Sequence, residues 1–198
     1  MRRDKAREPS ARAELTIREA LERGDPREAA AALASAYGHE LHGWLTASYG
    51  AADASEIYGD VMLRVSAAIS GFRGDSAART WLYQVARNEA RQALRRRRRT
   101  RPVFTPLDRH PSAEERPASE GQREDRDARV AALRARLSEE DRSLLVLRID
   151  RGFSYREIAS MAATGADDAA LEREAARLRR RVHDLGRRLR ARLDEERA

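Results

Sequence analysis

Cysteine is entirely missing from this chain of 198 residues, which excludes disulfide bonds, thiolate metal sites and thiol-based catalysis. Among the four histidines, only His39 and His42 are close in sequence, and no third ligand is placed beside them, so we expect no metal site. The chain also lacks a glycine-rich phosphate loop, a Ser/His/Asp arrangement and a paired-carboxylate signature. We therefore expect no enzyme and no cofactor.

Long apolar runs are missing as well, and none approaches the length that a membrane-spanning helix needs. The first ten residues, MRRDKAREPS, carry charge without the apolar segment that a signal peptide requires. We expect a cytoplasmic protein that has no membrane partner.

Lysine is almost absent: Lys5 is the only one among 40 basic residues, and the rest are arginine. The net charge of +7 and the isoelectric point near 10.5 indicate a polyanionic partner. Guanidinium groups bind phosphate and guanine bidentately, which would favour arginine at a nucleic-acid surface. A GC-rich coding bias produces the same excess, and we attribute most of it to that bias.

Alternating strand patterns are absent too, so the sequence predicts an all-α fold, with two small helical domains. We expect an N-terminal arm over 1–26, a first domain over 27–100, a linker over 101–127 and a second domain over 128–198. The arm contains a possible short helix between Ala11 and Arg23. The linker contains four of the six prolines. Between Asp108 and Asp127 there are seven acidic residues and four arginines, which predicts a flexible, mildly acidic segment.

Three helices are expected in the first domain. The first begins near Arg27 and ends at Tyr49 and Gly50, the second is capped by Asp53 and runs to about Ile69, and the third begins near Ser76 or Thr80. Their apolar faces are Leu33, Tyr37, Leu41, Trp44 and Leu45; Ile57, Tyr58, Val61, Met62, Val65 and Ile69; and Trp81, Leu82, Val85, Ala86, Ala90 and Leu94.

The third helix combines aromatic residues with a basic run. Between Arg87 and Arg101 there are eight arginines and one acid. Such a run is often only a solvated helix end or a localisation signal. Aromatics nearby, in the form of Phe72, Trp81 and Tyr83, favour a surface for melted DNA, because exposed bases stack on aromatic rings. Core packing and DNA contact are equally good interpretations of Trp81, whereas Tyr83 lies off the apolar stripe and is the better stacking candidate.

The second domain has the pattern of a helix-turn-helix unit. Ser138 begins a strongly apolar helix that Gly152 ends, and the capping box at Ser154 opens a short helix through Ala163. A turn over 164–168 then leads into a long helix. Its apolar seam is Leu171, Ala175, Leu178, Val182, Leu185, Leu189 and Leu193. Between Leu171 and Arg192 this helix carries nine arginines and three acids. The short capped helix before the turn favours a DNA-binding function for this basic helix. A solvated amphipathic helix or a coiled coil is the alternative interpretation.

These motifs together resemble the extracytoplasmic-function (ECF) group of bacterial RNA polymerase sigma factors. Residues 53–66, DASEIYGDVMLRVS, are similar to the family's DAEDLVQEVFLRVW, and residues 72–75 and 78–88 are similar to FRGE and FRTWLYRIARN. Residues 144–148 and 152–159 look like VLVLR and GLSYEEIA. The resemblance covers about 28–99, similar to region two, and about 129–193, similar to region four.

The resemblance implies core RNA polymerase and promoter DNA as partners. It places a polymerase-binding face, which docks on the clamp helices of the largest subunit, at Asp53, Glu56, Asp60, Leu63 and Arg64. The minus-ten element would be bound by Phe72, Arg73, Arg79, Trp81, Tyr83, Arg87, Asn88 and Arg91. The minus-thirty-five element would be bound by Ser154, Tyr155, Arg156, Arg173, Arg177, Arg180 and Arg181. The family also implies a contact with the flap of the second-largest subunit, a linker that threads toward the active-site channel, and an anti-sigma partner.

Some positions depart from the family pattern. Gly59, Ser66 and Ala78 stand where Gln, Trp and Phe are usual, and the turn before the last helix is about five residues longer, which changes the expected aim of the recognition helix. Two other functions fit the same residues: a stand-alone helix-turn-helix regulator that does not bind polymerase, and a non-specific arginine-rich nucleic-acid binder. Binding to core polymerase would distinguish a sigma factor from both of these alternatives.

Overall fold

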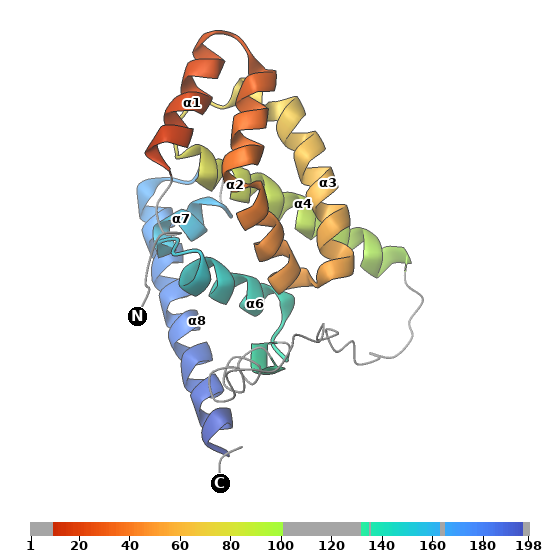
Figure 1. The fold of residues 1–198 in the computed structure, drawn as a ribbon. Coiled ribbons are helices and arrows are strands. Elements are labelled where there is room, and N and C mark those ends of the chain that lie inside the picture. Colours follow the sequence, from red (N-terminus) through yellow and green to blue (C-terminus); the bar gives the residue numbers. More distant parts are fainter. Residues whose placement is uncertain (1–9, 101–131, 135, 163–164, 196–198) are drawn as a thin grey trace, which may run out of the picture.

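The computed structural model describes residues 10–100, 132–134, 136–162 and 165–195, and every regular element in these ranges is helical (Figure 1). The all-α prediction is therefore confirmed. The predicted linker over 101–127 lies outside the described residues.

The N-terminal helix belongs to the folded core. Helix α1 (Ala11–Glu22) begins where the Ser10 hydroxyl accepts a hydrogen bond from the Ala13 amide, and it ends before Gly24, whose φ of 72° suits glycine. Ile17 and Ala20 are buried, and α1 packs along helix α2 (Pro26–Tyr49). The predicted helix is thus present, but the expectation of an arm separate from the first domain is wrong for these residues.

Helices α2 and α3 (Ala51–Ala68) form an antiparallel pair joined at Gly50 (Figure 1). All five residues of the predicted apolar face of α2 are buried. Ile57, Val61 and Val65 of α3 are also buried, and α3 packs against α2. The predicted cap at Asp53 is wrong, because the helix begins two residues earlier and Asp53 instead forms an ion pair with Arg97. A single 3₁₀ turn, η1 (Ile69–Gly71), ends α3.

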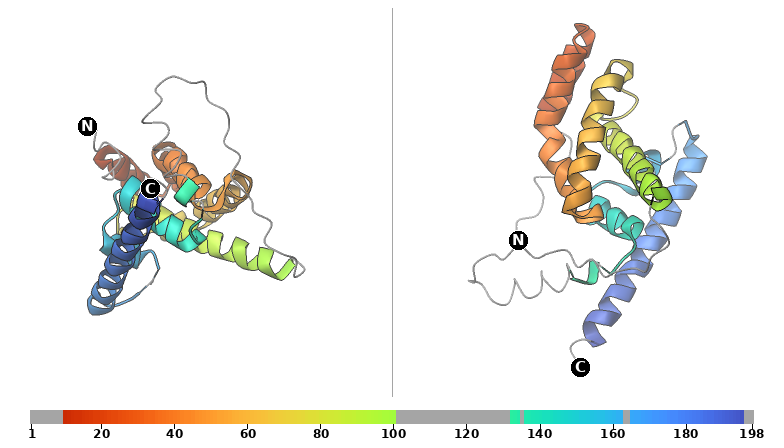
Figure 2. Two further views of the ribbon diagram at one scale, coloured as in Figure 1. Left: turned by 90° about the horizontal axis from the view of Figure 1, so that it is seen from below. Right: turned by 90° about the vertical axis from the view of Figure 1, so that its right-hand side faces the viewer.

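Helix α4 (Ala78–Thr100) crosses behind α2 and α3, and in the right-hand view of Figure 2 it lies between α3 and α8. Its first turn is capped by a side chain distant in sequence. The Glu14 carboxylate accepts hydrogen bonds from the Ala78 and Arg79 amides, at 2.7 and 3.1 Å. A carboxylate at this position pairs two backbone N–H donors that the helix itself leaves unpaired. Its negative charge also interacts favourably with the positive end of the helix dipole.

The second half of the chain contains α6 (Glu139–Leu145), the π-helical turn η2 (Val146–Asp150), α7 (Tyr155–Ser160) and the long α8 (Asp168–Glu195). Ser138 caps α6 as predicted, and Ser154 and Glu157 form the complete capping box predicted for α7. Helix α7 ends three residues before the predicted boundary at Ala163, which lies outside the described residues.

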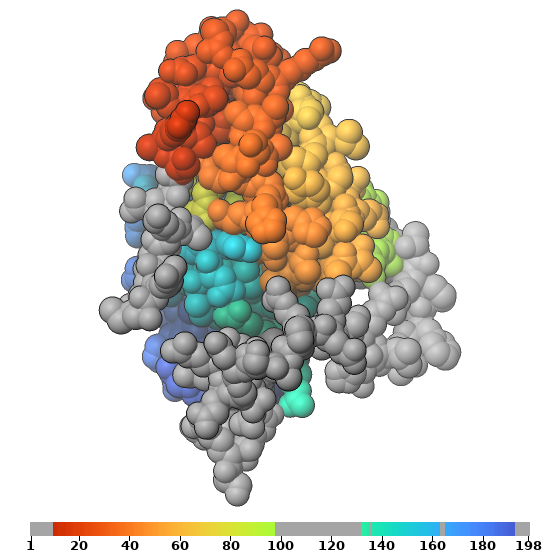
Figure 3. Space-filling model, viewed as in Figure 1, coloured from red at the N-terminus to blue at the C-terminus, as the bar shows by residue number. Residues whose placement is uncertain are grey.

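The two halves pack against each other and share one hydrophobic cluster. Helix α6 lies across the C-terminal part of α2, and Leu144, Leu147 and Phe153 join the cluster that α2 and α4 form. Figure 3 shows the surface of this segment, in cyan, directly against the orange surface of α2. The picture of two independent small domains is therefore incomplete, because in this structure their described residues form a continuous core.

Candidate functional site

The outer face of α3 carries the residues predicted to contact polymerase. Leu63 has 73% of its surface exposed, and Glu56 and Arg64 are exposed on either side of it. Asp60 pairs with Arg96 of α4 at 2.8 Å, so its carboxylate is partly neutralised. A single exposed leucine is common on protein surfaces, so exposure alone does not identify a binding site.

The loop before α4 presents an aromatic and basic surface. Phe72 packs on Trp81 with ring centroids 5.4 Å apart, and both rings are half-buried. Arg73 is well exposed and pairs with Asp75 at 3.1 Å. Asn88 is exposed, and Arg91 is half-exposed on the same helix. These five predicted minus-ten residues are accessible to a ligand.

Tyr83 and Arg79 do not lie on that accessible surface. Tyr83 is fully buried, and its hydroxyl donates to Glu40 at 2.8 Å, so the prediction that it lies off the apolar face is wrong. Arg79 has 1% of its surface exposed, and its Nε donates to the same carboxylate oxygen at 3.1 Å. Burial, reinforced by Glu40, raises the pKa of Tyr83, so this side chain stays a neutral donor.

Arg87 forms a hydrogen bond with the second half of the chain. Its Nη1 donates to the Ile158 carbonyl oxygen at 3.2 Å, and burial, with the nearby charge of Arg91, lowers the pKa of its guanidinium. Because arginine begins from a very high pKa, the group remains a cation. Three of the eight predicted minus-ten residues are thus engaged inside the folded chain.

The predicted upstream-element residues lie on α7 and α8. Ser154 is occupied by the capping box. The ring of Tyr155 lies beneath the guanidinium groups of Arg148 and Arg179, at 4.7 and 5.5 Å. Arg156 pairs with Asp168 and Glu172 at 2.6 Å each, which ties α7 to the first turns of α8 and raises the arginine pKa, chiefly through Glu172.

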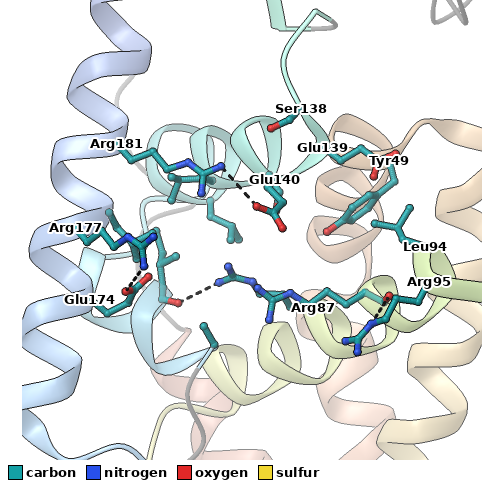
Figure 4. Close-up of a pocket in the computed structure, with 17 residues that line it drawn as sticks. Tyr49, Arg87, Leu94, Arg95, Ser138, Glu139, Glu140, Glu174, Arg177 and Arg181 are labelled. Carbon is teal, nitrogen blue, oxygen red and sulfur yellow. Dashed lines mark hydrogen bonds and ion pairs between the residues drawn. The ribbon is translucent and has the colours of Figure 1, made fainter. Parts of the chain in front are cut away.

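The four arginines of α8 differ in their surroundings. Arg173 and Arg180 are exposed. Arg177 is 78% exposed beside Glu174, whereas Arg181 pairs with Asp141 at 2.6 Å. Arg177 and Arg181 line a hollow of about 500 Å³ opposite Arg87, Arg91 and Arg95 of α4. Figure 4 shows Arg87 entering this hollow from α4, with Arg177 and Arg181 entering from α8.

Several residues that organise these surfaces gave no local signal in the sequence. Glu14 and Glu40 sit in ordinary amphipathic helices, yet their carboxylates hold Ala78, Arg79 and Tyr83. Gly43 lies inside α2, and the Arg151 guanidinium occupies the space that a side chain would need. Only an acidic residue on an otherwise apolar face, as at Glu40, would have been a usable clue.

Among the described residues no cluster of three or more potential ligands for a metal ion is present. In the same part of the chain no helix is both long enough and apolar enough to cross a membrane.

Comparison with known proteins identifies the family of this chain. Residues 33–100 match the model of sigma-70 region 2. The chain is also similar to the RNA polymerase sigma-H factor of Pseudomonas aeruginosa, with 31% identity over 158 residues, which is 72% of this chain and 79% of that protein. Helices α3 and α4 and most of α2 lie within residues 33–100. The chain belongs to the sigma-70 family of RNA polymerase sigma factors, in agreement with the ECF group.

The family defines the function in outline. The chain is a sigma factor of transcription initiation, with core RNA polymerase and promoter DNA as its partners.

Proposed function

We propose that this sigma factor docks on the largest-subunit clamp helices of core polymerase through the outward face of α3. The exposure of Leu63 within the family-matched helix is the observation that carries this assignment. An isolated leucine surrounded by Glu56, Asp60 and Arg64 combines apolar area with charges that fix register. The contact would bury Leu63 and leave the core of the first half undisturbed.

Leu63→Glu is the sharpest test of this docking face. The side chain is 73% exposed, so the change should leave helicity and the urea midpoint unchanged while co-purification with core polymerase falls at least tenfold. Leu15→Glu is the matched control, since Leu15 is 52% exposed on α1, outside the residues that match the family model. Asp60→Arg is less clean, because it would also place a cation beside Arg96. Unchanged binding by Leu63→Glu would refute the α3 assignment.

Promoter opening is assigned to the accessible part of the loop and α4. Phe72 and Trp81 offer aromatic faces to an extruded base, and Arg73, Asn88 and Arg91 offer donors to phosphates and base edges. Tyr83 and Arg79 act by holding α4 in place from inside. This division replaces Tyr83 with Trp81 as the stacking residue.

Recognition of the minus-thirty-five element is assigned to the α7 and α8 pair. Arg173 and Arg180 are exposed on the surface of α8 and are the first candidates to read base edges. The same half would contact the flap of the second-largest subunit, and the linker would enter the polymerase active-site channel. An anti-sigma partner would regulate the protein in the cytoplasm, and no catalytic step is assigned to the chain itself.

A stand-alone helix-turn-helix regulator remains the alternative function. It predicts sequence-specific DNA binding by the chain alone and no association with core polymerase. The proposed sigma factor instead requires core polymerase for promoter-specific transcription. Run-off transcription by core polymerase over a genomic promoter pool, with and without this chain, separates the two.

A further inference from the structure

A hollow of about 500 Å³ lies between α4, α6 and α8 (Figure 4). This volume is within the range of sites that hold small molecules. Five arginines and three glutamates line the hollow, so positive charge is in excess. The proposed promoter contacts use some of these arginines singly, and they leave the hollow itself unexplained.

Two of the three glutamates in the lining have arginine partners. Glu140 of α6 pairs with Arg181 of α8 at 3.6 Å, and Glu174 pairs with Arg177 at 3.8 Å. Among the described residues, Glu139 is the one lining glutamate without an ion pair. The α6 and α8 walls are therefore close to neutral overall.

The α4 wall carries the excess positive charge. Arg87 enters the hollow and donates to the Ile158 carbonyl oxygen at 3.2 Å, a contact that leaves its charge without a carboxylate (Figure 4). Arg91 lies one turn further along α4 and is half-buried. No carboxylate in the described ranges forms an ion pair with either guanidinium. Burial, together with the charge of Arg91, lowers the pKa of Arg87, as expected for two cations that share a partly buried space.

Two neighbouring guanidinium groups without a carboxylate are suited to a phosphate. Each guanidinium presents a planar fork of N–H donors that can bind two phosphate oxygens. A bound phosphate would also offset the repulsion between Arg87 and Arg91, which a partly buried site screens less than open water does. Tyr49, on the α2 side of the lining, adds a neutral hydroxyl, because burial raises its pKa.

Much of the remaining lining is apolar. It consists mainly of side chains from α4, α6, η2, α7 and α8, namely Leu94, Leu144, Leu147, Ile158 and Leu178. A ligand that was only an anion would leave this surface unused. A nucleotide combines phosphates with a flat base, which can pack on leucine side chains and on the ring of Tyr49.

We propose that this hollow binds a nucleotide, with its phosphates between Arg87 and Arg91 and its base on Leu94, Leu144 and Leu178. The backbone phosphates of DNA share part of this chemistry, so the experiment must separate the two sources. The site belongs to the chain by itself and does not rest on the proposed docking or promoter contacts.

Isothermal titration calorimetry of the full chain with ATP, in the absence of polymerase and DNA, tests the site. Arg91→Gln should weaken ATP binding by roughly tenfold or more, the loss expected when a charge-assisted hydrogen bond is removed. Its urea midpoint should stay the same or rise, because the repulsion with Arg87 is lost. The matched control is Arg18→Gln, which removes the same charge at an exposed position of α1 outside the hollow. Equal losses of ATP affinity in the two variants would overturn the proposal.

A change of the opposite sign is available at Glu139. Glu139→Gln removes a negative charge from the lining, so tripolyphosphate should bind more tightly, by roughly threefold. Glu19→Gln, at an exposed position of α1, should leave the affinity unchanged. An unchanged or weaker affinity in Glu139→Gln would place the anion elsewhere and refute the site.

Comparison of ATP, tripolyphosphate and DNA separates the sources of phosphate. ATP should bind more tightly than tripolyphosphate, because the base adds apolar contact; equal affinities would refute the contact with the base. ATP might instead fail to bind while random single-stranded DNA loses affinity selectively in Arg91→Gln, and these arginines would then bind DNA phosphates and the nucleotide site would be refuted. If the chain failed in polymerase-dependent transcription while the ATP results held, the proposed function would fail and the nucleotide site would stand.

Discussion

At the scale of single residues, Glu40 holds the first half and the interface together. Its carboxylate accepts hydrogen bonds from both Arg79 and Tyr83, and both donors then contact Phe153. A buried ion pair with several hydrogen bonds is costly to break on one side only. The position of α4 relative to α2 therefore depends on a charge inside the core.

Tyr83→Phe should lower the free energy of unfolding by about 1–3 kcal/mol, because Glu40 loses a donor while the ring and its packing remain. Urea denaturation at pH 7 measures this. The raised pKa of Tyr83 adds a pH dependence: the folded chain keeps the proton, so stability is full below the unfolded pKa of about 10 and is lost as the pH rises above it.

The alkaline loss of stability should be smaller in Tyr83→Phe than in the native chain. Burial also raises the pKa of Tyr37 and Tyr49, so part of the loss should persist. An identical alkaline profile for the two proteins would contradict the role given to Tyr83.

The sequence pattern predicted most of the buried residues, but it did not predict the burial of Tyr83. Leu33, Leu41 and Leu45 follow the helical period and are buried. Tyr83 is buried by residues from two other parts of the chain, because its ring packs on Trp44 of α2 and on Phe153, and its hydroxyl donates to Glu40. A contact between residues so far apart leaves no trace in local periodicity.

At the scale of helices, α1 determines how α4 begins. Glu14→Ala should cost about 1–2 kcal/mol of stability through loss of the cap, and amide hydrogen exchange at Ala78 and Arg79 should accelerate most. Glu19→Ala, an exposed change on the same helix, is the control. Equal exchange in the two variants would mean that α4 does not depend on this cap.

Helix boundaries were largely predictable because caps are local. Ser138, Ser154 and Gly50 act at the predicted places. The start of α4 at Ala78 agrees with the prediction near Ser76 or Thr80, but its cap was not predictable, since Glu14 lies 64 residues before Ala78. The docking of α1, for the same reason, could not be read from its amphipathic pattern.

The α8 arginines should separate into two groups when replaced by alanine. Those that contact phosphates lower affinity uniformly, whereas one that reads a base edge relaxes specificity at a defined upstream position by about 1–3 kcal/mol. We expect at least one of Arg173, Arg177, Arg180 and Arg181 to behave in the second way. Uniform losses on matched and scrambled upstream sequences for all four would leave promoter choice to the first half.

At the scale of the whole molecule, the shared hydrophobic cluster predicts cooperative unfolding. With Leu144, Leu147 and Phe153 packed into the core of the first half, the native chain should unfold in urea as one transition. Gly43→Leu should split it into two, because the halves would unfold separately once the interface is weakened. Circular dichroism and tryptophan fluorescence, which reports Trp44 and Trp81, should coincide for the native chain only.

The space at Gly43 also bears on how relatives of this chain can differ from it. In a relative with alanine or a larger residue at position 43, an arginine at position 151 would have to move the end of its side chain, since the Cβ would lie 2.7 Å from Nη2. The two positions should therefore change together in evolution, although 108 residues separate them along the chain. Relatives that keep both glycine and arginine should therefore keep this contact between α2 and the segment after η2.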